Sequence, residues 1–214
     1  MKVKVTLPEN IEDITLATFQ KYAKLLKRED LSDEDFNKRK VEIFTNLKYH
    51  DLDNVSFKDY EDLLKQIDIA LSVDVPFKDR FTLNDIEFGF IPNFDKITTK
   101  EFVDLSLYPL DEIENYHKLM AILFRPIKNK ELSFFKRWFF KNKTIEYSIQ
   151  DYNGTDAYAE MMKQTPMNIV NGALVFFYNL MKELQASTQR YTMQELLKAR
   201  QQVTSLKSGD GIPA

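Results

Sequence analysis

The chain has two imidazole side chains, His50 and His117, and imidazole is the commonest general base near neutral pH. His117 lies in the stretch DEIENYHKLMAILF, which we expect to be a helix with acids near its start. One hypothesis makes His117 a general base that Glu114 orients. The interpretation that we favour is a half-buried histidine with a structural role, because no recognisable catalytic constellation accompanies it.

The acid-rich stretch DLDNVSFKDYED could be taken for a calcium loop, since carboxylate oxygens are preferred calcium ligands. The spacing does not fit, because Val55 stands at the fifth position and Ser56 stands where an EF-hand requires glycine. We therefore interpret these acids as a solvated loop and a helix cap. The chain has no cysteine and no glycine-rich phosphate loop. We expect no metal, no cofactor and no catalytic residue.

The stretch KNKELSFFKRWFFKNK, residues 128–143, combines six cationic and five aromatic side chains. A protein-binding arm is one interpretation, because aromatic residues and arginine are enriched at interface hot spots. Its aromatics could instead pack on the protein's own body while the lysines reach outward. Contact with nucleic acid or with a membrane surface is less favoured, because the chain is acidic overall and the stretch is short. The residues that we expect to bind a partner are Phe134, Phe135, Arg137, Trp138, Phe139 and Phe140.

Three amphipathic helices are predicted within residues 13–72 from apolar residues at helical spacing. Ser32 and Ser56 are each followed three residues later by an acid, the pattern of a capping box. Before these helices, residues 2–7 alternate between charged and apolar residues and predict a short strand that ends at Pro8.

A small antiparallel β element is predicted in the middle of the chain. Asn84 and Asp85 form a turn-prone pair in RFTLNDIEFGFIP, which predicts a β-hairpin. The alternating stretch TIEYSIQ, residues 144–150, predicts a strand that pairs with this hairpin. Two helices lie between them, the first capped by Thr98 with Glu101 and the second covering residues 111–124.

A long helix is predicted after Thr165 and Pro166, with a second helix starting near Thr192. Gly172 inside the long helix costs about 1 kcal/mol of helix propensity, which close packing of another backbone would justify. The residues that we assign to helix packing are Gly172, Ala173, Phe176 and Phe177.

The whole pattern predicts one mainly helical α+β domain of 214 residues. We divide it into a helical subdomain at 1–75, a β-hairpin and helix region at 76–152, and C-terminal helices at 153–214. The net charge is −3, and no apolar run reaches the length of a membrane span or a signal peptide core.

The stretch TPMNIVNGALVFFYNLMKELQ resembles virion or tail-assembly proteins of tailed bacteriophages, including crAss-like phages. The likeness rests on Pro166, Met167, the Gly172–Ala173 pair and the Phe176–Phe177 pair, followed by Asn179 and Leu180. The stretches IEFGFIPNFDKITTKEFVDL, DEIENYHKLMAILFRPI and DYNGT are similar to the same group. Residues 128–143 depart from the resemblance, which covers about residues 11–185.

The resemblance implies a non-enzymatic structural or assembly protein, such as a ring, neck, portal or tail subunit. Its partners would be other phage structural proteins and further copies of itself, with no small-molecule substrate, nucleic acid or membrane. It would occur in the virion, and in the host cytoplasm during assembly. Two alternatives stay open: a tail-assembly chaperone that does not remain in the particle, and an enzyme or nucleic-acid-processing accessory protein that uses His117.

Overall fold

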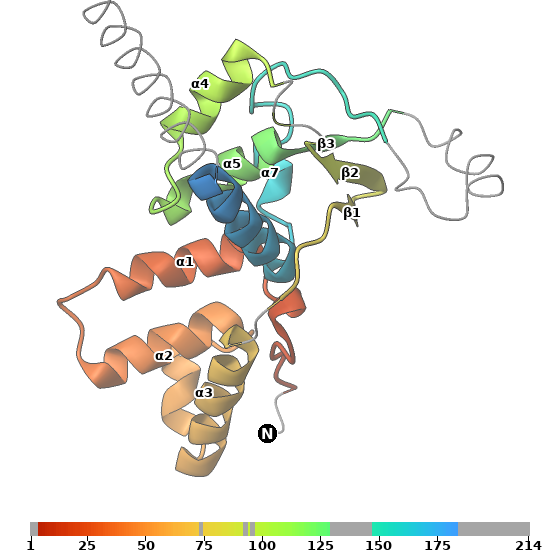
Figure 1. The fold of residues 1–214 in the computed structure, drawn as a ribbon. Helices are drawn as coiled ribbons and strands as arrows, with labels where there is room; N and C mark the ends of the chain where they lie inside the picture. Colours follow the sequence, from red (N-terminus) through yellow and green to blue (C-terminus); the bar gives the residue numbers. More distant parts are fainter. Residues whose placement is uncertain (1–3, 73–74, 92–93, 95–96, 129–146, 184–214) are drawn as a thin grey trace, which may run out of the picture. The chain divides into compact units, whose positions relative to one another are not determined.

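Side-chain caps set the start of the three N-terminal helices. The structure is a computed structural model, and it describes residues 4–72, 75–91, 94, 97–128 and 147–183. Thr15, Ser32 and Ser56 each accept a hydrogen bond from the backbone amide three residues later, which fixes the first turn. The helices are α1 (Leu16–Leu26), α2 (Asp33–Phe44) and α3 (Phe57–Leu71). α1 packs against α2, and α2 packs against α3 (Figure 1).

Two short 3-10 helices accompany the three N-terminal α-helices. The first, η1 (Ile11–Asp13), precedes α1, and the second, η2 (Tyr49–Asn54), connects α2 to α3. The predicted strand at residues 2–7 is wrong for the part that the structure describes, because residues 4–7 form no strand. The side chain of Asn46 takes the place of a neighbouring strand, since it accepts from the Thr6 amide and donates to the Lys4 carbonyl.

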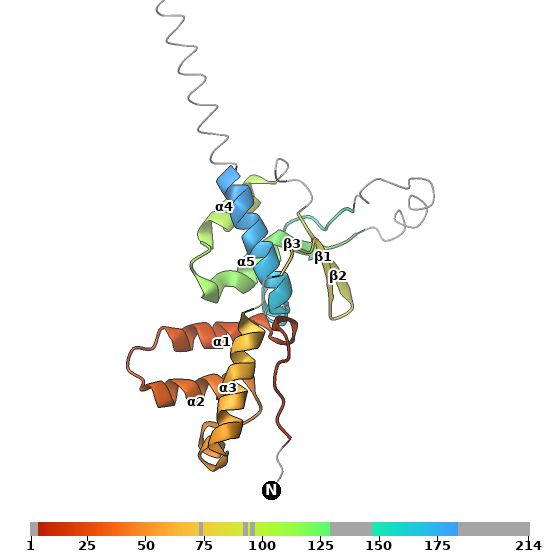
Figure 2. The ribbon, with the colours of Figure 1, turned by 60° about the horizontal axis from the view of Figure 1, so that its bottom comes forward.

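The predicted hairpin is confirmed, with β1 (Arg80–Leu83) antiparallel to β2 (Ile86–Phe90). Asn84 and Asp85 have φ values of 48° and 62°, the left-handed pair that a tight hairpin turn requires. The third strand is β3 (Phe124–Pro126), which pairs antiparallel with β2 and gives the order β1-β2-β3 (Figure 2).

The strand predicted at 144–150 is reduced, in its described part, to a single bridge between Ile149 and Ile127. The Lys128 amide donates to the Ser148 carbonyl and the Gln150 amide donates to the Pro126 carbonyl, at 2.8 and 2.9 Å. The described backbone of this stretch therefore pairs with the continuation of β3 and not with the hairpin, which the Tyr147 side chain contacts through its hydroxyl bond to the Phe90 carbonyl.

The core is densest around α5 (Tyr116–Leu123), which follows the 3-10 turn η4 (Ile113–Asn115). Every residue from Leu119 to Phe124 is buried, and the last of them already belongs to β3. The helix predicted at 111–124 is thus shorter than expected. α5 packs against α7 (Ala159–Met162) and contacts α4 (Thr99–Leu107).

The predicted fold class is confirmed: mainly helical, with N-terminal helices, a small antiparallel sheet and a long helix at 167–183. The helix expected near Thr192 lies outside the described residues. The chain divides into two units, residues 1–173 and 174–214. The first holds every labelled element, and of the second the structure describes the helical residues 174–183. The proposed subdivision at 75 and 152 stays a prediction.

Candidate protein-binding face on α4

The start of α4 draws an acidic side chain into the interior. The Thr98 hydroxyl accepts from the Glu101 amide at 3.2 Å, and Glu101 Oε2 accepts from the Thr98 amide at 2.6 Å. This reciprocal pair is the capping box that the sequence predicts. It leaves Glu101 only 2% exposed, so the carboxylate needs a partner inside the protein.

Arg125 of β3 is that partner. Its Nη2 lies 2.6 Å from Glu101 Oε1, and both side chains are buried. Burial lowers the pKa of Arg125, and the Glu101 carboxylate opposes this effect by stabilising the charged guanidinium. The ion pair joins α4 to the edge of the sheet, across 24 positions of sequence.

Tyr152 adds a second polar contact on the same side of α4. Its hydroxyl donates to Asp104 Oδ2 at 2.6 Å, and its ring centre lies 5.8 Å from the Arg125 guanidinium. Burial raises the pKa of Tyr152, and the hydrogen bond to Asp104 raises it further. The inner side of α4 therefore carries Glu101 and Asp104, which are both acidic and both engaged.

The outer side of α4 exposes three large apolar side chains beside the polar Thr99, Lys100 and Ser106. Phe102, Val103 and Leu107 are 56%, 49% and 61% exposed. A surface helix ordinarily buries its apolar side chains and exposes its carboxylates, whereas α4 buries Glu101 and exposes these three side chains. Buried charges beneath exposed large apolar side chains are the informative exception to ordinary burial, and such patches mark interaction sites.

The residues that we expected to bind a partner, Phe134 to Phe140, lie outside the described residues. Of the residues assigned to helix packing, Gly172 and Ala173 are buried in the first unit. In the second unit Phe177 is buried, whereas Phe176 is exposed.

Gly172 lies against another stretch of backbone. A Cβ atom at this position would lie 2.8 Å from the Pro76 carbonyl oxygen and 3.1 Å from the Phe77 Cα. Backbone atoms cannot move aside as a flexible side chain can. The close approach explains why glycine stands in the middle of a helix despite its low propensity.

His117 is buried and lies beside Gln20. The Gln20 Nε2 is 3.2 Å from His117 Nδ1 and 3.0 Å from the carbonyl oxygens of Ile113 and Glu114. An amide nitrogen only donates, so a hydrogen bond here requires an unprotonated Nδ1. Burial lowers the pKa of His117, and nearby Lys163 lowers it further.

The catalytic hypothesis requires the Glu114 carboxylate to orient His117, but this carboxylate binds a different side chain. The Glu114 carboxylate binds Lys27 Nζ at 2.8 Å. In the part of the chain that the structure describes, no group of three histidine or acidic side chains is placed to hold a metal ion. The described helices also include none that is long and apolar enough to cross a membrane.

Sequence reasoning placed α4 correctly but missed its arrangement. The sequence contained a signal for this arrangement. Glu101 and Asp104 are three residues apart and share one helical face, whereas Phe102 and Val103, one and two positions after Glu101, do not lie on that face. The partner Arg125 carried no such signal, since only the fold brings it to Glu101.

Comparison with family models, with curated proteins and with solved structures finds no match to the chain.

Proposed function

We propose that this protein is a non-enzymatic structural or assembly protein of a tailed bacteriophage particle, and that it works by binding other protein subunits. The observation that carries the protein-binding role is the outer side of α4, where Phe102, Val103 and Leu107 are exposed over a buried ion pair. The phage setting rests on the sequence resemblance at residues 166–180.

The exposed apolar side chains of α4 lower the stability of the isolated chain. Exposed apolar area is unfavourable by roughly 25 cal/mol per Å², and a protein partner would remove it from water. The buried pair beneath it fixes the orientation of the helix, because rotating α4 to bury Phe102 would bring Glu101 out and leave Arg125 unpaired. The apolar side is thus held outward.

In a ring, neck or tail subunit the partner would be another copy or another structural protein, with residues 128–143 and the C-terminal helix as further contacts. Subunits of a ring meet through two different surfaces, head to tail, and the contact closes by rotation. The alternative is an assembly chaperone that binds such a subunit and leaves the finished particle.

Light scattering on the purified full chain tests the proposal. We expect a mass that is a multiple of 25.3 kDa, and we expect Phe102→Ser with Leu107→Ser to lower it. Leu26→Ser with Ile69→Ser is the matched control, because these side chains are 54% and 49% exposed on other helices. A mass of 25.3 kDa at every concentration would contradict a ring subunit and favour the chaperone.

A further inference from the structure

An open groove of about 1580 Å³ lies in the first unit, between the N-terminal segment and the stretch formed by η2 and α3. Four carboxylates line it: Glu9, Asp51, Asp59 and Asp62. No lysine or arginine is among the described residues that line it. The groove therefore has one sign of charge.

These carboxylates are not neutralised by neighbouring cations. None of the four forms an ion pair with a residue that the structure describes, although other acids nearby, such as Asp53 and Asp68, do. Asp51 and Asp59 have local capping roles, because they bond the Lys48 amide and the Ser56 hydroxyl. Glu9 and Asp62 have no side-chain hydrogen bond with any described residue, so their charge faces whatever enters the groove.

The acids surround apolar side chains. Leu47, Val55 and Leu63 line the groove together with Leu7, and only Leu47 among them is fully buried. A ligand that fits this surface needs cations to meet the carboxylates and large apolar side chains to cover the leucines. A metal ion or a small polar ligand would leave the apolar part uncovered.

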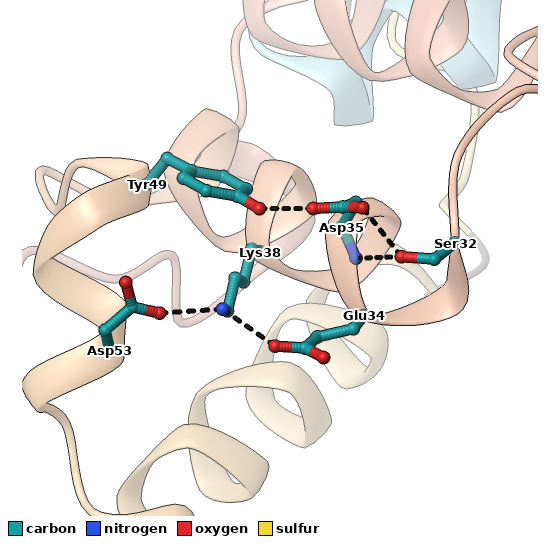
Figure 3. A network of polar contacts seen from close by, with 6 residues as sticks. All are labelled: Ser32, Glu34, Asp35, Lys38, Tyr49 and Asp53. Atoms are coloured by element: carbon teal, nitrogen blue, oxygen red, sulfur yellow. Dashed lines mark hydrogen bonds and ion pairs between the residues drawn. The ribbon is translucent and has the colours of Figure 1, made fainter.

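The wall of the groove that η2 forms is tied to α2 by a polar network (Figure 3). Lys38 Nζ lies 2.7 Å from Asp53 Oδ1 and 2.8 Å from Glu34 Oε1, and these contacts raise the pKa of Lys38. The Tyr49 hydroxyl donates to the Asp35 carboxylate, which lowers the pKa of Asp35 and raises that of Tyr49. The wall is thus in place before any ligand binds.

The sequence of this chain contains one stretch with the required chemistry. Residues 128–143 hold six of the 30 basic residues and one of the 33 acidic residues, so the stretch carries +5 and the rest of the chain −8. It also contains Phe134, Phe135, Trp138, Phe139 and Phe140. We propose that the acidic groove of one copy of this protein binds residues 128–143 of a second copy.

Such a contact is heterologous, because the groove and the stretch are different surfaces of the same chain. Each copy then offers a groove to one neighbour and a basic-aromatic stretch to the next, which is the contact that a ring requires. This inference rests on the proposed function and names the partner and the surface within it.

Charge reversal of the groove tests the inference without disturbing a cap. Glu9→Lys with Asp62→Lys should raise the dissociation constant for self-association at least about tenfold, measured by sedimentation velocity. Trp138→Ala should raise it about 30-fold, as loss of an interface hot spot does. Glu29→Lys with Glu61→Lys is the matched control, because it makes the same change in net charge on exposed residues outside the groove.

Complementation then distinguishes a contact between copies from one within a copy. The groove variant and the variant Lys136→Glu with Arg137→Glu should each stay monomeric, whereas their mixture should form a dimer. Each partner in that mixture supplies the surface that the other lacks. A chain with all four substitutions should recover self-association, because the charges are exchanged.

The outcomes separate the inference from the proposed function. A wild-type oligomer that the groove variant leaves intact would overturn the groove contact while the subunit role stands. A wild-type monomer at every concentration would overturn the groove contact and the ring subunit, and would favour the assembly chaperone. Loss of association in the control variant as well would also overturn the groove contact, since net charge alone would then explain the result.

Discussion

Two regions of the first unit each contain ion pairs, but they arrange their charged and apolar side chains in opposite ways. At α2 and η2, Lys38 binds the exposed carboxylates of Glu34 and Asp53 (Figure 3). The apolar Val41 and Phe44 of α2 are buried. At α4 the charges of Glu101 and Asp104 lie inside and Phe102 and Leu107 lie outside. The first arrangement is that of a helix in contact with water, and the second is that of a helix that we propose binds a partner.

Burial determines what each ion pair contributes. An exposed pair gains little, because water and salt screen it and two long side chains must be ordered. A buried pair is costly to form and costly to break, because removing one partner leaves a charge without solvent or counter-ion. The two regions therefore respond differently to the loss of one cation.

The largest effect is expected for Arg125→Ala. It leaves the Glu101 carboxylate buried without its counter-ion, and we expect the free energy of unfolding to fall by about 3–5 kcal/mol. Urea denaturation measures this. The double variant Glu101→Met with Arg125→Met removes both charges and should recover much of the loss. A single variant that loses under about 1 kcal/mol would show that the pair is solvated.

A series of stability measurements at different pH values separates the titration of the buried His117 from that of the carboxylates. The pKa of His117 is lowered in the fold, so the unfolded chain binds more protons once pH falls below about 6.5. Stability should decline from there toward the folded pKa, by at most about 1.4 kcal/mol per pH unit for one proton. His117→Gln should remove this decline, as followed by thermal unfolding at pH 5 to 7.5.

The half-buried carboxylate of Asp35 titrates in a lower pH range than His117. The pKa of Asp35 is lowered by its hydrogen bonds to Tyr49 and Ser32, so its contribution is present above the ordinary value near 3.9 and is lost below it. A decline between pH 6.5 and 5 that persists in His117→Gln would contradict the assignment to His117.

The smallest effect is expected for Lys38→Met. Its ammonium group bridges the exposed carboxylates of Glu34 and Asp53, which water can solvate if the lysine is lost. We therefore expect a much smaller fall in the urea midpoint than for Arg125→Ala. Lys38→Arg keeps the charge and is the control. An unfolding midpoint that falls as far as that of Arg125→Ala would remove the distinction between the two regions.

The sequence predicts the elements that local chemistry determines. Ser32, Ser56 and Thr98 mark helix starts that the structure confirms, and Asn84–Asp85 marks the hairpin turn. It does not predict features that depend on distant partners. The apolar end of the α5 stretch continues as β3 because β2 is there to pair with it, and residues 4–7 bond to Asn46 instead of joining a sheet.

The candidate site follows the same rule. Glu101 is recognisable from sequence as a capping residue, but its ion pair with Arg125 exists only through the packing of α4 against the sheet edge. The acids of residues 51–62 were predicted to form a solvated loop and a helix cap. Asp59 confirms the cap, whereas Asp51 lies in the 3-10 helix η2 rather than in a loop. The groove between these acids and the N-terminal segment could not be predicted from the sequence, because only the fold brings the two stretches together.

The central claim is that the outer side of α4 is covered when this protein assembles. The chain has no cysteine, so Leu107→Cys creates a single thiol whose labelling rate by a maleimide reports its accessibility. Leu26→Cys is the control, because Leu26 and Leu107 are similarly exposed. We predict that Leu107→Cys reacts about tenfold more slowly in the assembled fraction than in the dilute monomer, with Leu26→Cys unchanged. Equal rates for Leu107→Cys in both fractions, or a chain that never leaves the monomer, would contradict the claim.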